Sequence, residues 1–108
     1  MHYIKGVGMT KFGIHTETTQ ELCYEAIMEA LDDADMPLSE IDEIIIAKGD
    51  SQNDGERERL FQGVLSSILQ KENIPIIQIV AACCGGGVAL WNAINSQAKN
   101  SLIIGVEK

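Results

Sequence analysis

The sequence predicts an α/β fold with the element order βαβαβαβ and a mostly parallel, doubly wound sheet. Short β-branched runs alternate with segments of helical periodicity, and the connections between strands are long enough to cross over a sheet. The composition, 45% hydrophobic and 22% charged with two prolines, is that of a globular protein. The length of 108 residues allows one domain, residues 1–108, with a single core.

The first half of the chain contains a strand, a helix and a second strand. Residues 3–8 alternate as a strand does and end at a glycine. Thr18 and Glu21 have the spacing of a capping box, so a helix is expected over residues 20–35, before Pro37. Residues 43–48 contain three consecutive isoleucines and predict a buried parallel strand.

The second half repeats this alternation. Residues 49–56 are rich in Gly, Asp, Asn and Ser and predict a loop. Helical spacing follows over residues 57–71, then a strand over residues 74–81, a helix over 85–98 and a last strand over 102–106. Each crossover between parallel strands is expected to be right-handed.

Charge and cysteine usage exclude several classes of protein. A net charge of −8 with scattered basic residues argues against nucleic-acid binding. No apolar run is long enough to cross a membrane, and we expect a cytoplasmic protein. Three cysteines, two of them adjacent, do not form a disulfide framework. No metal site is expected, because zinc-ligand spacing is missing among the candidate ligands, which are His2, His15, Cys23, Cys83 and Cys84.

The segment most informative about chemistry is IVAACCGGGVAL, residues 79–90. An apolar strand leads directly into Cys83, three glycines and an apolar helix, which predicts a tight strand-to-helix turn. A cysteine there lies at the positive end of a helix dipole, where the reactive thiolate is stabilised. Backbone N–H groups at the same helix start can stabilise an oxyanion. The glycines suggest that another backbone or a ligand approaches closely.

The helix that follows has apolar residues around most of its circumference. Such a helix is buried on nearly all sides, which implies a covering layer from another domain or chain. Three other interpretations of the turn stay open. Cys83 can be a small packing residue, the glycines can form a phosphate cradle although neither GxGxxG nor GxxxxGK[ST] is present, and adjacent Cys83 and Cys84 can be a redox pair although CxxC is the usual spacing.

Four stretches resemble the thiolase superfamily, and more narrowly the archaeal and sterol-carrier-protein-type thiolases related to acetyl-CoA acetyltransferase. They are IKGVGMTKF (4–12), EAIMEALDDADMPLSEIDEIII (25–46), AACCGGGVAL (81–90) and IIGVEK (103–108). The resemblance implies that Cys83 is the catalytic nucleophile, which takes the acyl group of acyl-CoA as a thioester. Cys84 stands where the family usually has alanine, and Gly85 replaces a common serine.

The resemblance also implies that the chain is an incomplete N-terminal half of a thiolase-like fold. The activating histidine, the Asn-Glu motif, the second catalytic cysteine and the loop domain that holds coenzyme A belong to later parts of such enzymes. The implied reaction is acyl transfer between CoA thioesters, as in acetoacetyl-CoA formation or cleavage, with the CoA thioester as substrate and no cofactor. The implied partner is a second copy in a homo-oligomer or a complementing C-terminal half. The alternatives are a non-catalytic fragment that binds a partner chain and an anion-binding βα module.

Overall fold

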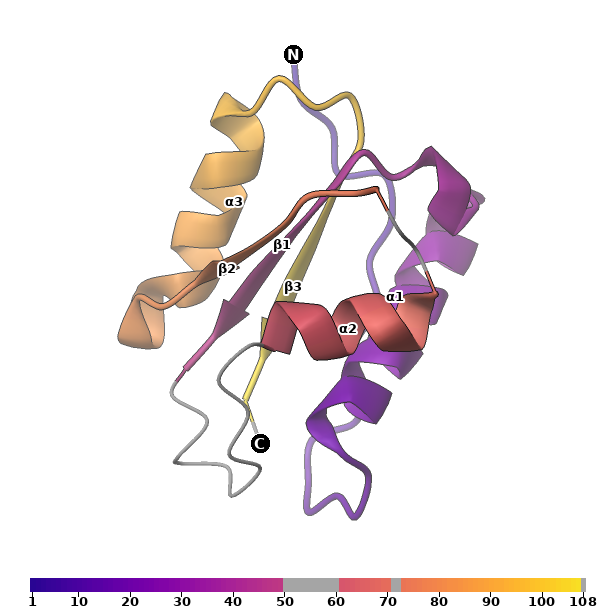
Figure 1. The fold of residues 1–108 in the computed structure, drawn as a ribbon, viewed down its shortest axis with the longest axis vertical. Helices are drawn as coiled ribbons and strands as arrows, with labels where there is room; N and C mark the ends of the chain where they lie inside the picture. Colours follow the sequence, from indigo (N-terminus) through magenta and orange to yellow (C-terminus); the bar gives the residue numbers. More distant parts are fainter. Residues whose placement is uncertain (50–60, 71–72, 108) are drawn as a thin grey trace.

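The computed structural model describes residues 1–49, 61–70 and 73–107. Figure 1 shows a small sheet between two layers of helices. The elements are, in chain order, α1 (Thr19–Ala34), the 3₁₀ turn η1 (Leu38–Glu40), β1 (Glu43–Lys48), α2 (Phe61–Leu69), β2 (Ile76–Ile79), the 3₁₀ turn η2 (Ala82–Cys84), α3 (Gly85–Asn95) and β3 (Ser101–Val106).

The described strands form one parallel sheet in the order β2-β1-β3. Ile44 of β1 is paired with Ile76 of β2 and with Leu102 of β3. Helices α1 and α2 cover one face of the sheet and α3 lies on the other (Figure 1). This arrangement confirms the predicted α/β, doubly wound, parallel fold class.

The two faces of β1 belong to two separate cores. Ile44 and Ile46 pack with residues of α1 and α2 in the larger core, whereas Ile45 and Ala47 pack with Ala89 of α3 in the smaller one. All six residues of β1 are buried, as expected for a central parallel strand.

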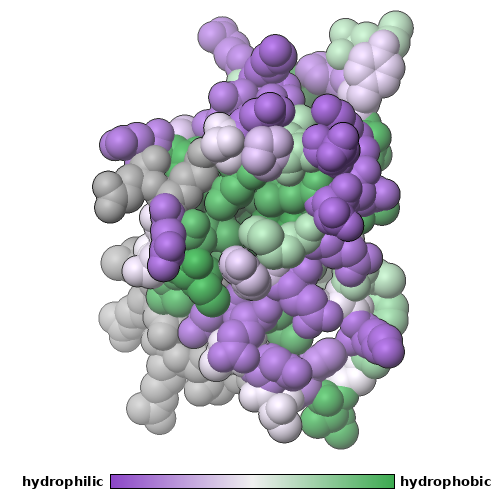
Figure 2. All heavy atoms as spheres, turned by 90° about the vertical axis from the view of Figure 1, so that its right-hand side faces the viewer, coloured by the Kyte–Doolittle hydropathy of each residue, from purple (hydrophilic) through white to green (hydrophobic). Residues whose placement is uncertain are grey.

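Seen from the side of α1 and α2, hydrophilic residues cover much of the surface and apolar residues lie among them (Figure 2).

Helix α1 begins and ends where its caps predict. Thr18 accepts a hydrogen bond from the Glu21 N–H at 3.3 Å, which satisfies one N–H group of the first turn. Asp35 adopts a left-handed conformation at the C-cap, with φ of 51°, and its N–H donates to the carbonyls of Leu31 and Asp32. The capping box is therefore confirmed in its Thr18 part.

The strand predicted over residues 3–8 is wrong, because this segment has no strand structure. It lies instead along α1, where a Cβ on Gly6 would overlap the Ala30 carbonyl oxygen. A Cβ on Gly8 would likewise overlap the carbonyl oxygen of Ala26. The Val7 N–H donates to the Asp33 carboxylate at 2.9 Å, so this backbone group bonds to α1 instead of to a strand.

Other predicted boundaries differ by a few residues. The strand predicted over 74–81 is limited to Ile76–Ile79, since Pro75 has no N–H to donate and the chain then enters η2. The helix predicted over 85–98 ends at Asn95, because Ser96 has an extended conformation. The helix predicted over 57–71 is observed as Phe61–Leu69. Its predicted ends, residues 57–60 and 71, lie outside the described residues. Residues 50–56 of the predicted loop lie outside them as well.

The outer side of α3 is exposed in this chain. Leu90, Trp91 and Ile94 keep 41%, 64% and 44% of their surface accessible. The predicted apolar helix is therefore present, but the described residues do not bury it on all sides.

Within those residues, no helix has the length and apolar character needed to span a membrane.

Candidate active site

Cys83 lies in a sharp turn between β2 and α3. The turn contains the 3₁₀ element η2 and is closed by a hydrogen bond of 3.1 Å from the Cys84 N–H to the Ala81 carbonyl. Ala82, directly before Cys83, has a φ of 47°, in the left-handed region that non-glycine residues rarely adopt. Such strain persists only where the surrounding structure imposes it, and it is common at functional sites.

The three glycines after the turn have two different surroundings. Gly85 is buried, and a Cβ at this position would lie 3.3 Å from the Ala47 side chain, so glycine lets α3 approach β1 closely. Gly86 and Gly87 are exposed, and a Cβ on either would meet nothing within 4 Å. At Gly85 the close neighbour is therefore the Ala47 side chain and not the backbone or ligand that the glycines predicted, and open space lies beside the other two.

The three cysteines have separate environments. Cys23 is 2% exposed in the larger core, as its position on the apolar face of α1 predicts. Cys84 is exposed, and its thiol donates to the Ala81 carbonyl at 3.2 Å. Cys83 is exposed at the turn, with a free thiol. Cys84 is therefore part of the hydrogen bonding that closes the turn, and Cys83 is accessible to a reagent or substrate.

A wide cleft of about 1250 Å³ opens in front of Cys83. Its floor is formed by the carboxyl ends of the three strands, and Cys83, Gly85 and Gly86 lie on its wall. The chain leaves β1 toward α2 on one face of the sheet and leaves β2 toward α3 on the other. Ligands of open parallel sheets bind outside the carboxyl ends of strands, at such a change of direction. Cys83 therefore has the position expected of a ligand-contacting residue.

The ends of β1 and β3 are held together at this cleft. The Gly49 N–H donates to the Glu107 carboxylate at 2.7 Å, across the ends of the two strands. Lys48, the last residue of β1, is 3% exposed and also lines the cleft. The floor of the cleft therefore includes the hydrogen-bonded ends of β1 and β3 and the buried Lys48.

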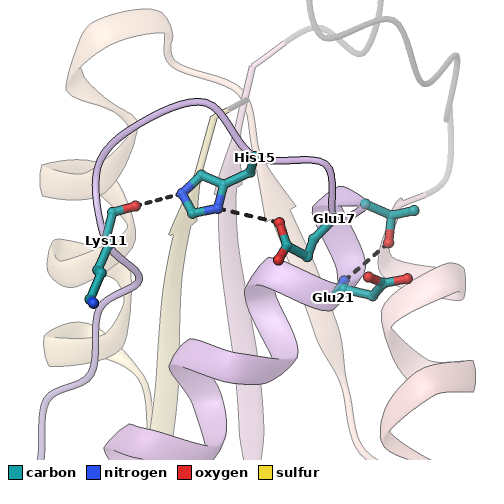
Figure 3. A network of polar contacts seen from close by, with 5 residues as sticks. Lys11, His15, Glu17 and Glu21 are labelled. Atoms are coloured by element: carbon teal, nitrogen blue, oxygen red, sulfur yellow. Dashed lines mark hydrogen bonds and ion pairs between the residues drawn. The ribbon is translucent and has the colours of Figure 1, made fainter.

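The loop before α1 lines the same cleft and brings His15 to it. Figure 3 shows the His15 ring between the backbone carbonyl of Lys11 and the carboxylate of Glu17. Its Nε2 lies 2.5 Å from the Lys11 oxygen and its Nδ1 lies 3.4 Å from Glu17 Oε2. The sequence pattern did not connect His15 with Cys83, because the two residues are far apart in the chain and the loop has no periodicity that shows where it folds.

The contacts of His15 decide what it can do chemically. Each ring nitrogen of His15 has an oxygen acceptor as its neighbour in this conformation. A general base needs an unpaired ring nitrogen, and His15 does not offer one in this conformation. The pKa of the Glu17 carboxyl is lowered from its ordinary value, first by its own backbone N–H and then by the His15 ring.

The described residues do not bring together three side chains able to hold a metal ion. His2 is exposed and is not among the residues that line the cleft. Of the residues singled out by the sequence, only Cys83 and His15 reach the rim of the cleft with accessible side chains. The chemistry that this chain itself offers at the cleft is therefore that of a thiol next to a helix start.

Comparison with known proteins identifies the fold. A scan against protein-family models gives no match. A search of curated proteins also finds no match. Among solved structures, the chain is similar to 3-oxoacyl-[acyl-carrier-protein] synthase III from Aquifex aeolicus VF5, with a TM-score of 0.71 and 29% sequence identity. The similarity covers 87% of this chain and 31% of that chain.

These values show that the chain has part of a thiolase-like fold, as the resemblance in the sequence predicts. The chain spans about a third of the length of the structure that it matches. The particular type of thiolase stays a prediction.

Proposed function

We propose that this chain is the nucleophile-bearing segment of a thiolase-type acyltransferase and that Cys83 accepts the acyl group. The observation that carries the proposal is the place of Cys83: exposed, on a strained turn before α3, at the edge of a cleft outside the carboxyl ends of parallel strands. The proposed substrates are CoA thioesters, and the proposed reaction is acetoacetyl-CoA formation or cleavage. The proposed location is the cytoplasm.

The proposed first step is a transfer between two sulfur atoms. The Cys83 thiolate attacks the carbonyl carbon of acyl-CoA, a new carbon–sulfur bond forms, and the bond to the coenzyme sulfur breaks. The coenzyme leaves as a thiolate and takes up a proton.

The oxyanion formed in this step needs N–H donors near Cys83. The Cys84 and Gly85 N–H groups already donate to the carbonyls of Ala81 and Ala82, within the turn. An α-helix leaves four N–H groups at its start without intrahelical partners. We therefore assign the oxyanion to the remaining N–H groups in the first turn of α3, beside the open space at Gly86 and Gly87.

The similarity to a solved structure supports an acyl-transferring function. That protein is named a 3-oxoacyl-[acyl-carrier-protein] synthase, and the region of similarity includes most of this chain. The chain spans about a third of that protein, however, and its only histidine at the cleft has both nitrogens engaged. The proposal therefore includes a complementing C-terminal half or an oligomeric partner that supplies the activating base.

Mass spectrometry tests the proposal directly. The chain is incubated with acetyl-CoA, alone and with a C-terminal thiolase half, and the intact mass is measured after removal of free coenzyme. We expect an adduct of one acetyl group that Cys83→Ala abolishes and Cys84→Ala retains. An adduct that survives Cys83→Ala, or that is lost only with Cys84→Ala, contradicts the proposed role of Cys83.

A second candidate function is a non-catalytic binding module. The exposed apolar side of α3 favours it, since an apolar face of this kind is typical of an interaction surface. The two candidates differ in the acetyl adduct, because a binding module associates with its partner without acylation of Cys83. The mass measurement described above therefore separates them.

A further inference from the structure

The start of α3 rests on a side chain of the central strand. Gly85, the first residue of α3, is buried, and a Cβ built on it would lie 3.3 Å from the Cβ of Ala47 in β1. Carbon atoms in favourable contact lie about 3.5–4.0 Å apart. The two positions together therefore have room for one methyl group and not for two.

Ala47 is held in place from both sides of the sheet. It is paired with Ile79 of β2 and with Gly105 of β3. Its side chain is 7% exposed and packs in the smaller core with Ile45 and Ala89. Because close-packed interiors transmit strain, an added methyl group between β1 and α3 should displace the start of the helix and not the central strand.

Backbone hydrogen bonds connect the start of α3 to Cys83. The Gly85 N–H donates to the Ala82 carbonyl, and the Cys84 N–H donates to the Ala81 carbonyl at 3.1 Å. Cys83 lies within both of these closed turns. The Cys84 thiol also donates to the Ala81 carbonyl, at 3.2 Å. A displacement of Gly85 should therefore move Cys83, which lies two residues before it.

The neighbouring glycines do not share this restriction. A Cβ on Gly86, Gly87 or Gly105 would meet nothing within 4 Å. Among the described glycines of α3 and β3, the size limit therefore applies to Gly85 alone, and Ala47 is the residue that imposes it.

We propose that Ala47 is a positioning residue for Cys83. Its methyl group sets how closely the start of α3 approaches β1, and the hydrogen-bonded turn passes that position to the Cys83 thiol at the wall of the cleft. The importance of Ala47 for acyl transfer rests on the proposed function, whereas its effect on the geometry and reactivity of the thiol does not.

An exchange of the two side chains tests the proposal. The rate of Cys83 alkylation by iodoacetamide is measured in the native chain by peptide mass spectrometry, and stability is followed by urea unfolding. Gly85→Ala should lower this rate by at least about fivefold, because a small displacement of a reacting group has a large effect on rate. Adding Ala47→Gly to that variant removes the opposing methyl group and should restore the rate to within about threefold of the original.

Ala93→Gly and Gly63→Ala are the matched controls. Ala93 packs against the same core farther along α3, so Ala93→Gly should destabilise the protein and still leave the Cys83 rate within about threefold. Gly63 lies in α2, where a Cβ would meet nothing within 4 Å. The glycine-to-alanine change at that position should leave the rate unaltered.

Should Gly85→Ala lose its circular dichroism, Ala47→Gly alone replaces it. Without the Ala47 methyl group the start of α3 has no fixed approach to β1, and the Cys83 rate should fall by at least about threefold. A smaller loss than expected, a loss in Gly85→Ala that Ala47→Gly does not restore, or equal slowing by Ala93→Gly overturns the proposal. If the expected rates are found but the unaltered chain takes up no acetyl group, the result counts against the proposed function alone.

Discussion

Replacing Ala82 by glycine should stabilise the protein. Ala82 has a φ of 47° in the turn before Cys83. A left-handed conformation costs a residue with a Cβ roughly 1–2 kcal/mol, and glycine is free of this cost. Glycine loses more chain entropy on folding, by about 0.5–1 kcal/mol, which offsets part of the gain. The expected net change is a stabilisation of about 0.5–1 kcal/mol.

Urea unfolding, followed by Trp91 fluorescence at one protein concentration, measures this change. The unfolding midpoint of Ala82→Gly should move to higher urea, and the melting temperature should rise by roughly 2–8 °C. Ala93→Gly is the control, since Ala93 lies within α3 and packs against the smaller core. There the same chemical change should destabilise by about 1 kcal/mol or more.

Ala82→Gly also tests whether the strained turn serves Cys83. If the strained turn holds Cys83 in one reactive geometry, the Cys83 thiol of Ala82→Gly should react more slowly with iodoacetamide, although the protein is more stable. If Ala82→Gly destabilises the protein as much as Ala93→Gly does, the left-handed conformation of Ala82 is not a source of strain and the reasoning fails.

Three further predictions concern the core, the N-terminal segment and the loop at the cleft. Cys23→Ser should destabilise the protein by about 1–3 kcal/mol, because it buries a hydroxyl. Cys83→Ser lies at the surface and should change the free energy of unfolding by less than about 0.5 kcal/mol. Urea unfolding measures both changes. Gly6→Val should destabilise by about 1–3 kcal/mol, since its side chain overlaps the backbone of α1. In an NMR titration the pKa of Glu17 should lie below its ordinary value, and His15→Gln should raise it only in part, because the backbone N–H is the larger cause.

Each of these predictions has a control or an opposing result. Gly105→Ala serves as the control for Gly6→Val, because a Cβ at Gly105 meets nothing within 4 Å. Equal reactivity of all three thiols toward a thiol reagent in the native protein would contradict the burial of Cys23. The lowered pKa of Glu17 contributes stability above the ordinary pKa of a glutamate, and this contribution is lost as the pH falls through the lowered value. Glu17→Gln should remove that dependence.

The elements whose cause is local were predicted well from the sequence. The isoleucine run at 44–46 predicts a central buried strand, and β1 has the predicted bounds, because β-branched residues fit a pleated, buried strand. The cap at Thr18 and the turn at Cys83 were predicted for the same kind of reason. Their signals lie within a few residues of the structure that they determine.

The elements that depend on distant contacts were not predicted. Alternation over residues 3–8 fits a strand, yet the segment lies on α1, because Gly6 and Gly8 allow an approach to Ala30 and Ala26 that no local rule encodes. His15 was not associated with the cleft for a similar reason. Its loop folds over the ends of the strands through contacts with residues far away in the chain.

The sequence by itself determined the layers of the fold, the strand-to-helix turn and the identity of its cysteine, since hydrophobic periodicity, capping and glycine placement act over one or two turns of chain. Only the tertiary structure decided that Cys83 opens onto a cleft, that His15 has both nitrogens engaged there, and that the outer side of α3 is left uncovered by the described residues. These features depend on which surfaces meet across the sheet. Packing between distant segments sets that outcome, and local preference does not encode it.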